Sequence, residues 1–267
     1  MGPYRLSIVL PAYNEEASIV EAISHATAVA DCLCDEHEII IVDDGSRDRT
    51  AELVREMSVG DPRVRLVRHP RNLGYGEALR TGFRSAHLDL VFFTDADNQF
   101  DLGEIEGFLP LIEHVDVVAG YRINRQDHLL RRMFAKGWNY LVRVLFYVPV
   151  RDIDCAFKLF RRPVFDRIDL ESVGAMVNTE LMVKLGRSGA RVIEIGVTHY
   201  PRAAGQARGA TPRVIARAFV ELVKMYGRLQ RAGFHPAGPK MKAVDFPSST
   251  NAADFPAPMD AVDSPPP

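Results

Sequence analysis

Short apolar runs alternate with segments of helical periodicity along the first half of the chain. The runs are four to six residues long and rich in β-branched side chains, as in the buried strands of parallel sheets. Strands are therefore expected at residues 6–11, 38–43, 64–67, 90–94 and 115–119, and helices at about 16–30, 49–57, 76–86 and 102–113. This alternation predicts an α/β fold with an open, doubly wound, mostly parallel sheet.

Composition restricts the class of protein. The chain has 267 residues, 47% of them hydrophobic, which suits one large domain with extensions. A formal net charge of -2 at pH 7 argues against a general nucleic-acid binder. Cys32, Cys34 and Cys155 form no C-x-x-C pair, so we expect neither a disulfide framework nor a zinc site. The apolar run 138–150 is interrupted by Arg143 and is shorter than the roughly 20 residues that cross a bilayer, and no signal-peptide pattern opens the chain.

The segment that follows the fourth predicted strand carries the clearest chemistry. Asp95 and Asp97 are separated by one residue, so on an extended backbone both carboxylates point to the same side. Two such carboxylates suit a hard divalent cation, Mg²⁺ or Mn²⁺, whose usual partner is a diphosphate. A D-x-D triplet by itself is more often a solvated turn or a helix cap, so its context decides the interpretation.

Polar clusters also follow the first three predicted strands, at residues 11–15, 43–46 and 72–76. Ligands of doubly wound sheets bind beyond the carboxyl ends of the strands, so these clusters and the Asp pair are expected at one rim. Taken singly, residues 43–46 favour a strand-to-helix turn with Asp48 as the N-cap. The Gly-x-Gly at 74–76 does not complete a dinucleotide fingerprint and follows the third strand, which excludes a Rossmann dehydrogenase.

In this order, Pro11-Ala12-Tyr13-Asn14-Glu15, Asp43-Asp44-Gly45-Ser46, Asn72-Leu73-Gly74 and Asp95-Ala96-Asp97-Asn98-Gln99 resemble the family 2 inverting glycosyltransferases of GT-A fold. Within that family the chain is most similar to the dolichol-phosphate mannose synthase group, which transfers a sugar from a nucleotide donor to a polyprenyl phosphate. The finer resemblance rests on Gln99, Gly120-Tyr121-Arg122, residues 151–160, Glu180 and residues 199–205. It covers about residues 5–208.

The resemblance implies a role for each matching position. Asp95, Asp97 and Gln99 would hold Mg²⁺ or Mn²⁺, which orients the donor and neutralises charge on the leaving diphosphate. Catalysis would rest on Asp97, Gln99, Arg122 and Arg132. The donor nucleotide would contact Pro11, Ala12, Tyr13, Glu15, Asp43, Asp44, Asp95 and Arg202.

The acceptor needs cations more than it needs a base. A phosphate monoester with a second pKa near 6 is largely dianionic at pH 7, so it is nucleophilic without deprotonation. Arg122, Arg132 and Lys136 are the expected contacts to its phosphate, since arginine binds phosphate through two hydrogen bonds and lysine as a point charge. Arg125 and Arg131 fit a solvated helix face equally well.

Residues 211–231 predict a basic amphipathic helix. Five basic residues lie on one face and an apolar stripe that includes Phe219, Leu222 and Tyr226 lies on the other. Two alternatives remain open: the helix lies in a lipid headgroup layer, or it packs on the catalytic domain. The expected organisation is a single catalytic domain at 1–210, the helix within 211–235 and a disordered tail at 236–267.

The sequence thus predicts a metal-dependent hexosyltransferase that acts with inversion on a GDP- or UDP-hexose, so that an α-linked donor gives a β-linked polyprenyl-phosphate sugar. We expect it in the cytoplasm, peripheral on the cytoplasmic face of a membrane, with a membrane-protein partner as a further option. One alternative is a family 2 transferase that acts on a saccharide or glycolipid hydroxyl, with Glu180 or Asp154 as its base. A second is a catalytically silent module that binds nucleotide sugars. The chain has no Q-x-x-R-W sequence typical of processive synthases.

Overall fold

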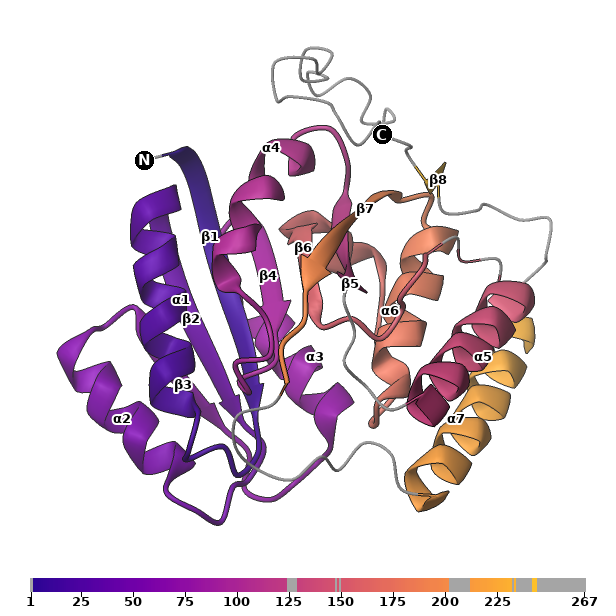
Figure 1. Ribbon diagram of the computed structural model, residues 1–267, viewed down its shortest axis with the longest axis horizontal. Helices are drawn as coiled ribbons and strands as arrows, with labels where there is room; N and C mark the ends of the chain where they lie inside the picture. Colours follow the sequence, from indigo (N-terminus) through magenta and orange to yellow (C-terminus); the bar gives the residue numbers. More distant parts are fainter. Residues whose placement is uncertain are drawn as a thin grey trace.

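The computed structural model describes residues 2–123, 129–146, 148, 150–201, 212–231, 233 and 242–243. Its strands form one mixed sheet in the order β3-β2-β1-β4-β6-β5-β7-β8 (Figure 1). The strands are β1 Gly2–Ala12, β2 Cys34–Asp43, β3 Val64–Arg68, β4 Leu90–Thr94, β5 Val117–Ile123, β6 Phe157–Arg161, β7 Arg191–Thr198 and β8 Lys242–Ala243. All neighbouring pairs are parallel except those of β6, which runs antiparallel to β4 and β5.

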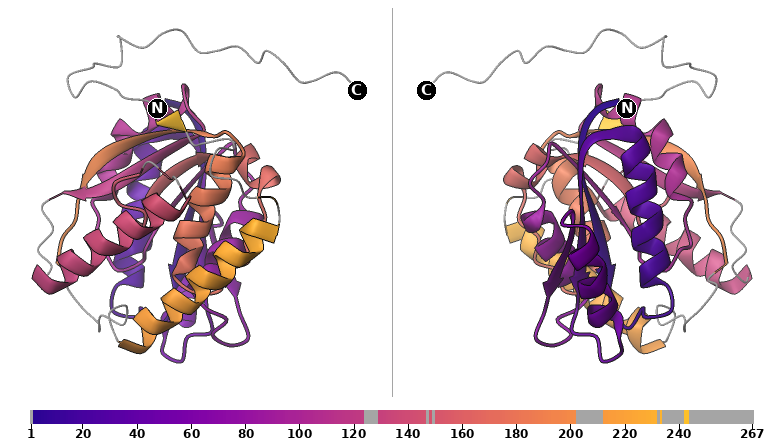
Figure 2. Two further views of the ribbon diagram at one scale, coloured as in Figure 1. Left: turned by 90° about the vertical axis from the view of Figure 1, so that its right-hand side faces the viewer. Right: turned by 90° about the vertical axis from the view of Figure 1, so that its left-hand side faces the viewer.

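The helices cover both faces of this sheet. They are α1 Ile19–Leu33, α2 Thr50–Gly60, α3 Tyr75–Ser85, the 3₁₀ helix η1 Leu102–Gly107, α4 Leu109–Ile112, α5 Leu129–Phe146, the 3₁₀ helix η2 Arg162–Arg167, α6 Met176–Arg187 and α7 Pro212–Arg231. Helix α1 contacts α2 and η1, whereas α3 contacts α6, which in turn contacts α7 (Figure 2). The predicted α/β fold with a doubly wound, mostly parallel sheet is confirmed.

Central strands are buried on both faces because helices cover both. Every residue of β4 is buried, and the run 39–43 of β2 is almost completely inaccessible. This explains why these strands appear in the sequence as continuous apolar runs instead of alternating patterns. Aromatic rings fill the centre, where Phe92 and Phe157 pack edge to face with their centroids 4.7 Å apart.

Several elements differ from the sequence prediction. Strands β1 and β2 begin four residues earlier than expected, at Gly2 and Cys34. The expected helix at 102–113 is wrong in its continuity, since it divides into η1 and α4 at Phe108. Pro110 stands in the first turn of α4 and has no N–H with which to continue a helix from the preceding turn. Strand β5 begins two residues later than expected, at Val117, and extends to Ile123.

Helix α7 packs part of its apolar surface on the domain. Leu222, Met225 and Leu229 are buried, and the ring of Phe219 meets Trp138 of α5 edge to face at 5.5 Å. A second apolar strip remains exposed, with Val220 at 53% and Val223 at 70%. One apolar strip of α7 therefore packs on the domain, as the second alternative expects. The other strip faces outward and leaves contact with a lipid headgroup layer open. No described helix is both long enough and apolar enough to span a membrane.

Candidate functional site

The carboxyl ends of β1, β2 and β4 and the loop after β3 surround one cleft of about 280 Å³. All four polar clusters of the sequence contribute to its lining, so the expectation that they share a rim is confirmed. The lining residues are Pro11, Ala12, Tyr13, Glu15, Asp44, Asn72, Gly74, Tyr75, Ala78, Asp95, Ala96 and Asp97. Six of the eight residues expected to bind the donor are among them. A neighbouring cavity of about 240 Å³ shares Tyr13 and Asn72 with this cleft.

Asp95 and Asp97 lie together in this cleft, directly after β4. The Tyr75 hydroxyl donates to Asp95 Oδ1 at 2.9 Å, and the Gln99 backbone N–H donates to Asp97 Oδ1 at 3.2 Å. Burial and the charge of Asp97 raise the pKa of Asp95 to about 7, against the smaller opposing effects of Tyr75, Arg122 and Lys158. Such mutual repulsion between carboxylates is relieved when a cation binds between them.

The donor set fits a hard divalent cation. It consists of carboxylate oxygens in an open cleft, and Mg²⁺ or Mn²⁺ is commonly held by one or two carboxylates together with substrate phosphates. Among the residues that the structure describes, no cluster of three or more His, Cys, Asp or Glu side chains is placed to hold a metal. A bound diphosphate and water would supply further ligands.

Cation binding at this pair is expected to depend on pH. The pKa of Asp95 is about 7 in the folded protein, against an ordinary value of 3.8. The protonated carboxyl group therefore stabilises the metal-free fold at low pH, and this stabilisation is lost as the pH rises through 7. A cation must displace the proton below that pH, so Mn²⁺ affinity should fall by up to about tenfold per pH unit between pH 7 and pH 6. Titration calorimetry at pH 6, 7 and 8 measures this dependence. An Mn²⁺ affinity that stays the same across that range would contradict the prediction.

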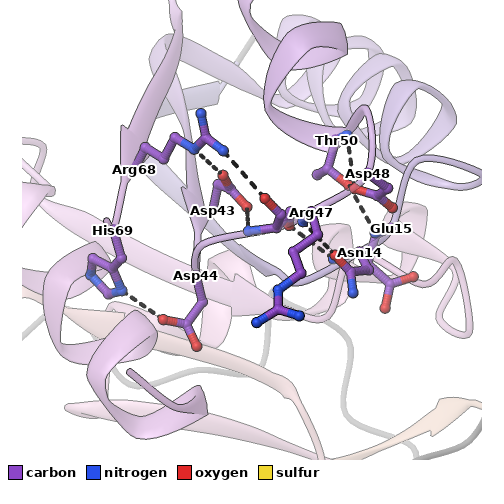
Figure 3. A network of polar contacts seen from close by, with 10 residues as sticks. Asn14, Glu15, Asp43, Asp44, Arg47, Asp48, Thr50, Arg68 and His69 are labelled. Atoms are coloured by element: carbon purple, nitrogen blue, oxygen red, sulfur yellow. Dashed lines mark hydrogen bonds and ion pairs between the residues drawn. The ribbon is translucent and has the colours of Figure 1, made fainter. Parts of the chain in front are cut away.

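Asp43 and Asp44 have their carboxylates engaged within the protein (Figure 3). Asp43 is fully buried, accepts from the Ser46 N–H at 2.9 Å and pairs with Arg68 Nε at 2.9 Å. Asp44 accepts from the backbone N–H groups of residues 73 and 74 at 2.8 Å and contacts His69 Nδ1 at 2.7 Å. In this arrangement both aspartates shape the loops of the cleft, and only Asp44 also lines it.

The first polar cluster is joined to the second by a network of hydrogen bonds (Figure 3). Asn14 has a positive φ of 54° and donates its backbone N–H to Ser46 Oγ at 2.9 Å. Its Oδ1 accepts from the Arg47 N–H at 2.8 Å, and the Glu15 N–H donates to Thr50 Oγ1 at 2.9 Å. The backbone that follows Tyr13 is thereby fixed against the loop before α2 and against its first residue.

A third network holds the loop at 72–76. Gly74 adopts a φ of 106°, and the Gly76 N–H donates to the Val173 carbonyl at 2.7 Å. Glu180 in turn holds residues 171–172, accepting from the Ser172 N–H at 2.6 Å and pairing with Lys184 at 2.7 Å. Burial raises the pKa of Glu180, but the hydrogen bonds from Lys184 and Ser172 outweigh it and lower the pKa overall. Glu180 is 1% exposed, so it supports the loop and does not line the cleft as a base would.

Gly76→Ala tests how tightly this loop must pack. A Cβ at Gly76 would lie 2.0 Å from the Ser172 carbonyl oxygen, so either α3 or the 171–173 loop must move. We expect a loss of about 2–4 kcal/mol in the free energy of unfolding, as for other overpacked sites. Gly227→Ala in α7 is the matched control, because nothing lies within 4 Å of its added Cβ, and it should stabilise by about 0.5–1 kcal/mol. Urea unfolding measures both, and equal effects would contradict the prediction.

Arg122 lies near the end of β5 and forms a bidentate ion pair with Asp152. Its Nε donates to Asp152 Oδ2 at 2.6 Å and its Nη2 to Asp152 Oδ1 at 2.7 Å, with both side chains largely buried. Desolvation by burial opposes the charge, but the hydrogen bond and the charge of Asp152 raise the pKa of Arg122 overall. Because Arg122 also lowers the pKa of Asp95, its guanidinium acts electrostatically on the D-x-D segment.

The other predicted site residues are placed as follows. Gln99 donates its side-chain amide to the Tyr200 carbonyl at 3.0 Å, and the Tyr200 N–H donates to the Gln99 carbonyl at 2.8 Å, which joins the D-x-D loop to the end of β7. Arg132 and Lys136 belong to α5, but their side chains lie outside the described part of the chain, as does the whole of Arg202.

Two residues of the site carried no signal that the sequence analysis used. Arg68 and His69, at the end of β3, hold Asp43 and Asp44. Both residues stand at the end of a strand that neighbours the strand ending in the acidic pair. Basic residues in that position of a sequence are therefore candidates for such partners.

A family model described as "Glycosyl transferase family 2" matches residues 7–169. The chain is 34% identical over 207 residues to an undecaprenyl-phosphate 4-deoxy-4-formamido-L-arabinose transferase of Aeromonas hydrophila subsp. hydrophila, covering 76% of this chain and 62% of the relative. It is 34% identical over 226 residues to a protein of the same name from Pseudomonas fluorescens, covering 82% of this chain and 65% of the relative. The chain therefore spans somewhat less than two thirds of the length of these relatives.

Solved structures resemble the fold. A glucosyl-3-phosphoglycerate synthase of Mycobacterium tuberculosis in complex with Mn²⁺, UDP-glucose and phosphoglyceric acid superposes with a TM-score of 0.64 at 20% identity, covering 84% of this chain and 80% of that one. A mannosyl-3-phosphoglycerate synthase of Rubrobacter xylanophilus gives a TM-score of 0.64 at 21% identity, covering 88% of this chain and 79% of that one. At this level of identity the likeness shows a shared fold alone.

Proposed function

Because the chain belongs to glycosyl transferase family 2, we propose that it transfers a glycosyl group from a nucleoside diphosphate sugar to a polyprenyl phosphate with inversion at the anomeric carbon. The observation that carries this proposal is the position of Asp95 and Asp97 in a cleft formed by four strand ends. The names of the two undecaprenyl-phosphate transferases support the choice of acceptor.

Asp95 and Asp97 would hold Mg²⁺ or Mn²⁺ against the donor diphosphate. When bound, such an ion supplies charge neutralisation for the departing nucleoside diphosphate. A protein of similar fold, the glucosyl-3-phosphoglycerate synthase, was crystallised with Mn²⁺ and UDP-glucose, which supports a divalent cation and a nucleotide sugar for this chain as well. Tyr75 contributes by directing its hydroxyl at Asp95, which keeps that carboxylate oriented toward the cleft.

The nucleoside of the donor would lie along residues 11–15 and 72–74, where hydrogen bonds within the protein already fix the backbone. Asp44 and His69 hold the second of these segments in place. A prearranged cleft of this kind lowers the entropic cost of orienting the donor before transfer. Assays with GDP-sugars and UDP-sugars distinguish which nucleotide the donor carries.

The acceptor phosphate would approach from the side of Arg122. One of its oxygens forms a bond to the anomeric carbon while the bond from that carbon to the diphosphate breaks, and the nucleoside diphosphate leaves. The phosphate arrives ionised, so the step requires no general base. Asp152 fixes Arg122 through two hydrogen bonds, and the proposal assigns Arg132 and Lys136 of α5 to the same phosphate.

Glu180 was one candidate base for the alternative in which a hydroxyl is the acceptor. Its burial and its bonds to Ser172 and Lys184 suit a supporting role, which favours phosphate over hydroxyl as the nucleophile. Asp154 belongs to the segment that contains Asp152 and is absent from the lining of the cleft. The relatives are named for an arabinose derivative, so the transferred group is proposed here as a glycosyl group that includes hexoses and substituted pentoses.

A polyprenyl acceptor lies in a bilayer, so the protein has to approach one. Exposed apolar side chains on α5 and α7 offer a surface for this, with Tyr140 at 70%, Val144 at 51% and Val223 at 70% exposed. Lys224 and Arg228 of α7 would add attraction to anionic headgroups, at about 1 kcal/mol for each basic residue. We propose peripheral contact with the cytoplasmic face of a membrane, where nucleotide sugars are present.

A partition assay tests the proposal. Purified protein is incubated with Mn²⁺ and radiolabelled GDP- or UDP-sugars, including a hexose and a 4-substituted pentose, and with undecaprenyl phosphate or an alkyl glycoside as the acceptor. Label that enters the organic phase only with the prenyl phosphate supports the proposed reaction. Transfer to the alkyl glycoside alone would support the hydroxyl alternative, and specific nucleotide binding without transfer to any acceptor would support a silent module.

A further inference from the structure

A lysine lies at the centre of the sheet, between apolar neighbours on the two adjacent strands. Lys158 of β6 is 1% exposed and pairs in register with Phe93 of β4 and Ala119 of β5. Its ammonium lies 5.5 Å from the centroid of the Phe93 ring. Placing a charged amine so deep costs several kcal/mol of desolvation, and burial accordingly lowers the pKa of Lys158. A residue that only filled this space would be more stable if it were apolar.

The hydrogen bonds of Lys158 show where its charge acts. Its Nζ donates to the Ile153 carbonyl at 3.1 Å and also to the Cys155 carbonyl. These carbonyls belong to the 151–155 turn, which also contains Asp152, the partner of Arg122. The ammonium therefore fixes the backbone of the turn that carries the partner of Arg122.

Three other elements hold the same turn. Asn139 of α5 accepts from the Ile153 N–H at 3.2 Å, and Glu194 of β7 accepts from the Arg151 N–H at 2.7 Å. The Arg122 backbone N–H of β5 donates to Asp152 at 3.3 Å, in addition to the contacts of its guanidinium. The turn thus joins the strand that carries Arg122 to α5, the helix that carries Arg132 and Lys136.

We propose that Lys158 is a positioning residue for the acceptor phosphate: by holding the 151–155 turn it sets the Asp152 carboxylate, and with it the Arg122 guanidinium, beside the D-x-D segment. The inference rests on the proposed function in one respect, because that function makes the acceptor phosphate the ligand of Arg122. The positioning itself concerns the geometry of Arg122 and is measured without substrate. The Lys158 side chain is 1% exposed and its Nζ is directed at backbone carbonyls, so the proposed role is positioning and not contact with a substrate.

Lys158→Met tests this, because methionine is unbranched, similar in length and uncharged. We expect kcat/KM for undecaprenyl phosphate to fall about 100-fold, as when a positioned group is misplaced by about 1 Å. The affinity for nucleoside diphosphate with Mn²⁺, measured by calorimetry, should stay within about threefold of the wild type, since the donor loops are held by other bonds. Leu159→Ala is the matched control: Leu159 is the next residue of β6, fully buried and on the other face, so this variant should be less stable yet keep the acceptor kinetics.

Asn139→Ala is the milder second variant and carries the test if Lys158→Met does not fold. It removes another hold on the turn and should lower kcat/KM for the acceptor by about tenfold, at the upper end for one hydrogen bond. Acceptor kinetics within threefold of the wild type in the folded variants, or an equal loss of donor affinity, would overturn the inference.

A readout free of substrate separates this inference from the proposed function. In the wild type, the Arg122 Nε–H donates to Asp152 at 2.6 Å and should exchange slowly with water by NMR. We expect exchange at least about tenfold faster in Lys158→Met or Asn139→Ala than in Leu159→Ala. If the wild type fails to use prenyl phosphate, the proposed function fails while this measurement still decides the inference. Unchanged exchange in both variants would refute the positioning role.

Discussion

Asp97→Asn is expected to lower kcat by at least about 1000-fold, because it removes one of the two carboxylates proposed to hold the cation. Charge stabilisation by a bound metal contributes several kcal/mol to a transition state, and each 1.36 kcal/mol is a factor of ten in rate. Asparagine has the shape of aspartate, so the backbone after β4 should keep its conformation. The protein should therefore fold normally and lose turnover even with saturating donor.

Asp89→Asn is the control for this substitution. Asp89 directly precedes β4, at the opposite end of the strand from Asp97, and its exposed side chain pairs weakly with Arg5 at 3.3 Å. Its replacement should leave kcat within about twofold, as is usual for exposed positions away from a site. Metal titration of both variants by calorimetry completes the comparison. Turnover of Asp97→Asn within tenfold of the wild type would show that the pair does not hold the essential ion.

Arg122→Lys is expected to lower kcat/KM for the prenyl phosphate by about 100-fold while it changes donor affinity little. Lysine keeps the charge but loses the planar fork, so it cannot reproduce the bidentate pairing with Asp152 and offer a further N–H to phosphate. Asp152→Asn should give a smaller effect in the same direction, since it loosens the guanidinium without removing it. In a double-mutant cycle the two changes should be clearly non-additive.

Arg151→Ala provides the matched control for Arg122. Arg151 is the neighbouring arginine of the turn, its side chain is 65% exposed, and it lies over the Tyr121 ring at 4.8 Å from the centroid. Its replacement should change kcat/KM by less than about threefold, as for most exposed residues. Initial rates over a range of acceptor concentrations, at saturating donor, are measured for the wild type, the two single variants, the double variant and Arg151→Ala. If Arg151→Ala lost as much activity as Arg122→Lys, a general electrostatic attraction would explain the data better than a specific phosphate contact.

The order of elements in the N-terminal half was predictable because burial leaves a direct mark on sequence. Strand β4 is apolar from Leu90 to Phe93 and ends where the first aspartate of the pair must face water or a ligand. Given a parallel sheet, the end of each such strand lies at the same rim, so the cleft followed from the strands alone. The antiparallel insertion of β6 left no comparable mark, because pairing direction depends on the path of the chain between β5 and β6.

The roles of individual acidic residues were harder to assign. Asp43 and Asp44 appear in the sequence as free carboxylates after a strand, and their partners Arg68 and His69 come 25 residues later along the chain. Only the parallel pairing of β2 with β3 brings these groups together. Lys158 is similar, because only the pairing of β6 with β4 and β5 buries it and directs it to the carbonyls of a turn.

The position of the cation tests the central claim most directly. Crystals grown with Mn²⁺ and either UDP or GDP can be measured for the anomalous scattering of manganese. The account predicts a peak between the carboxylates of Asp95 and Asp97, with the diphosphate bound to the same ion and the nucleoside along residues 11–15. Manganese and nucleotide bound together at any other place in the fold would contradict it.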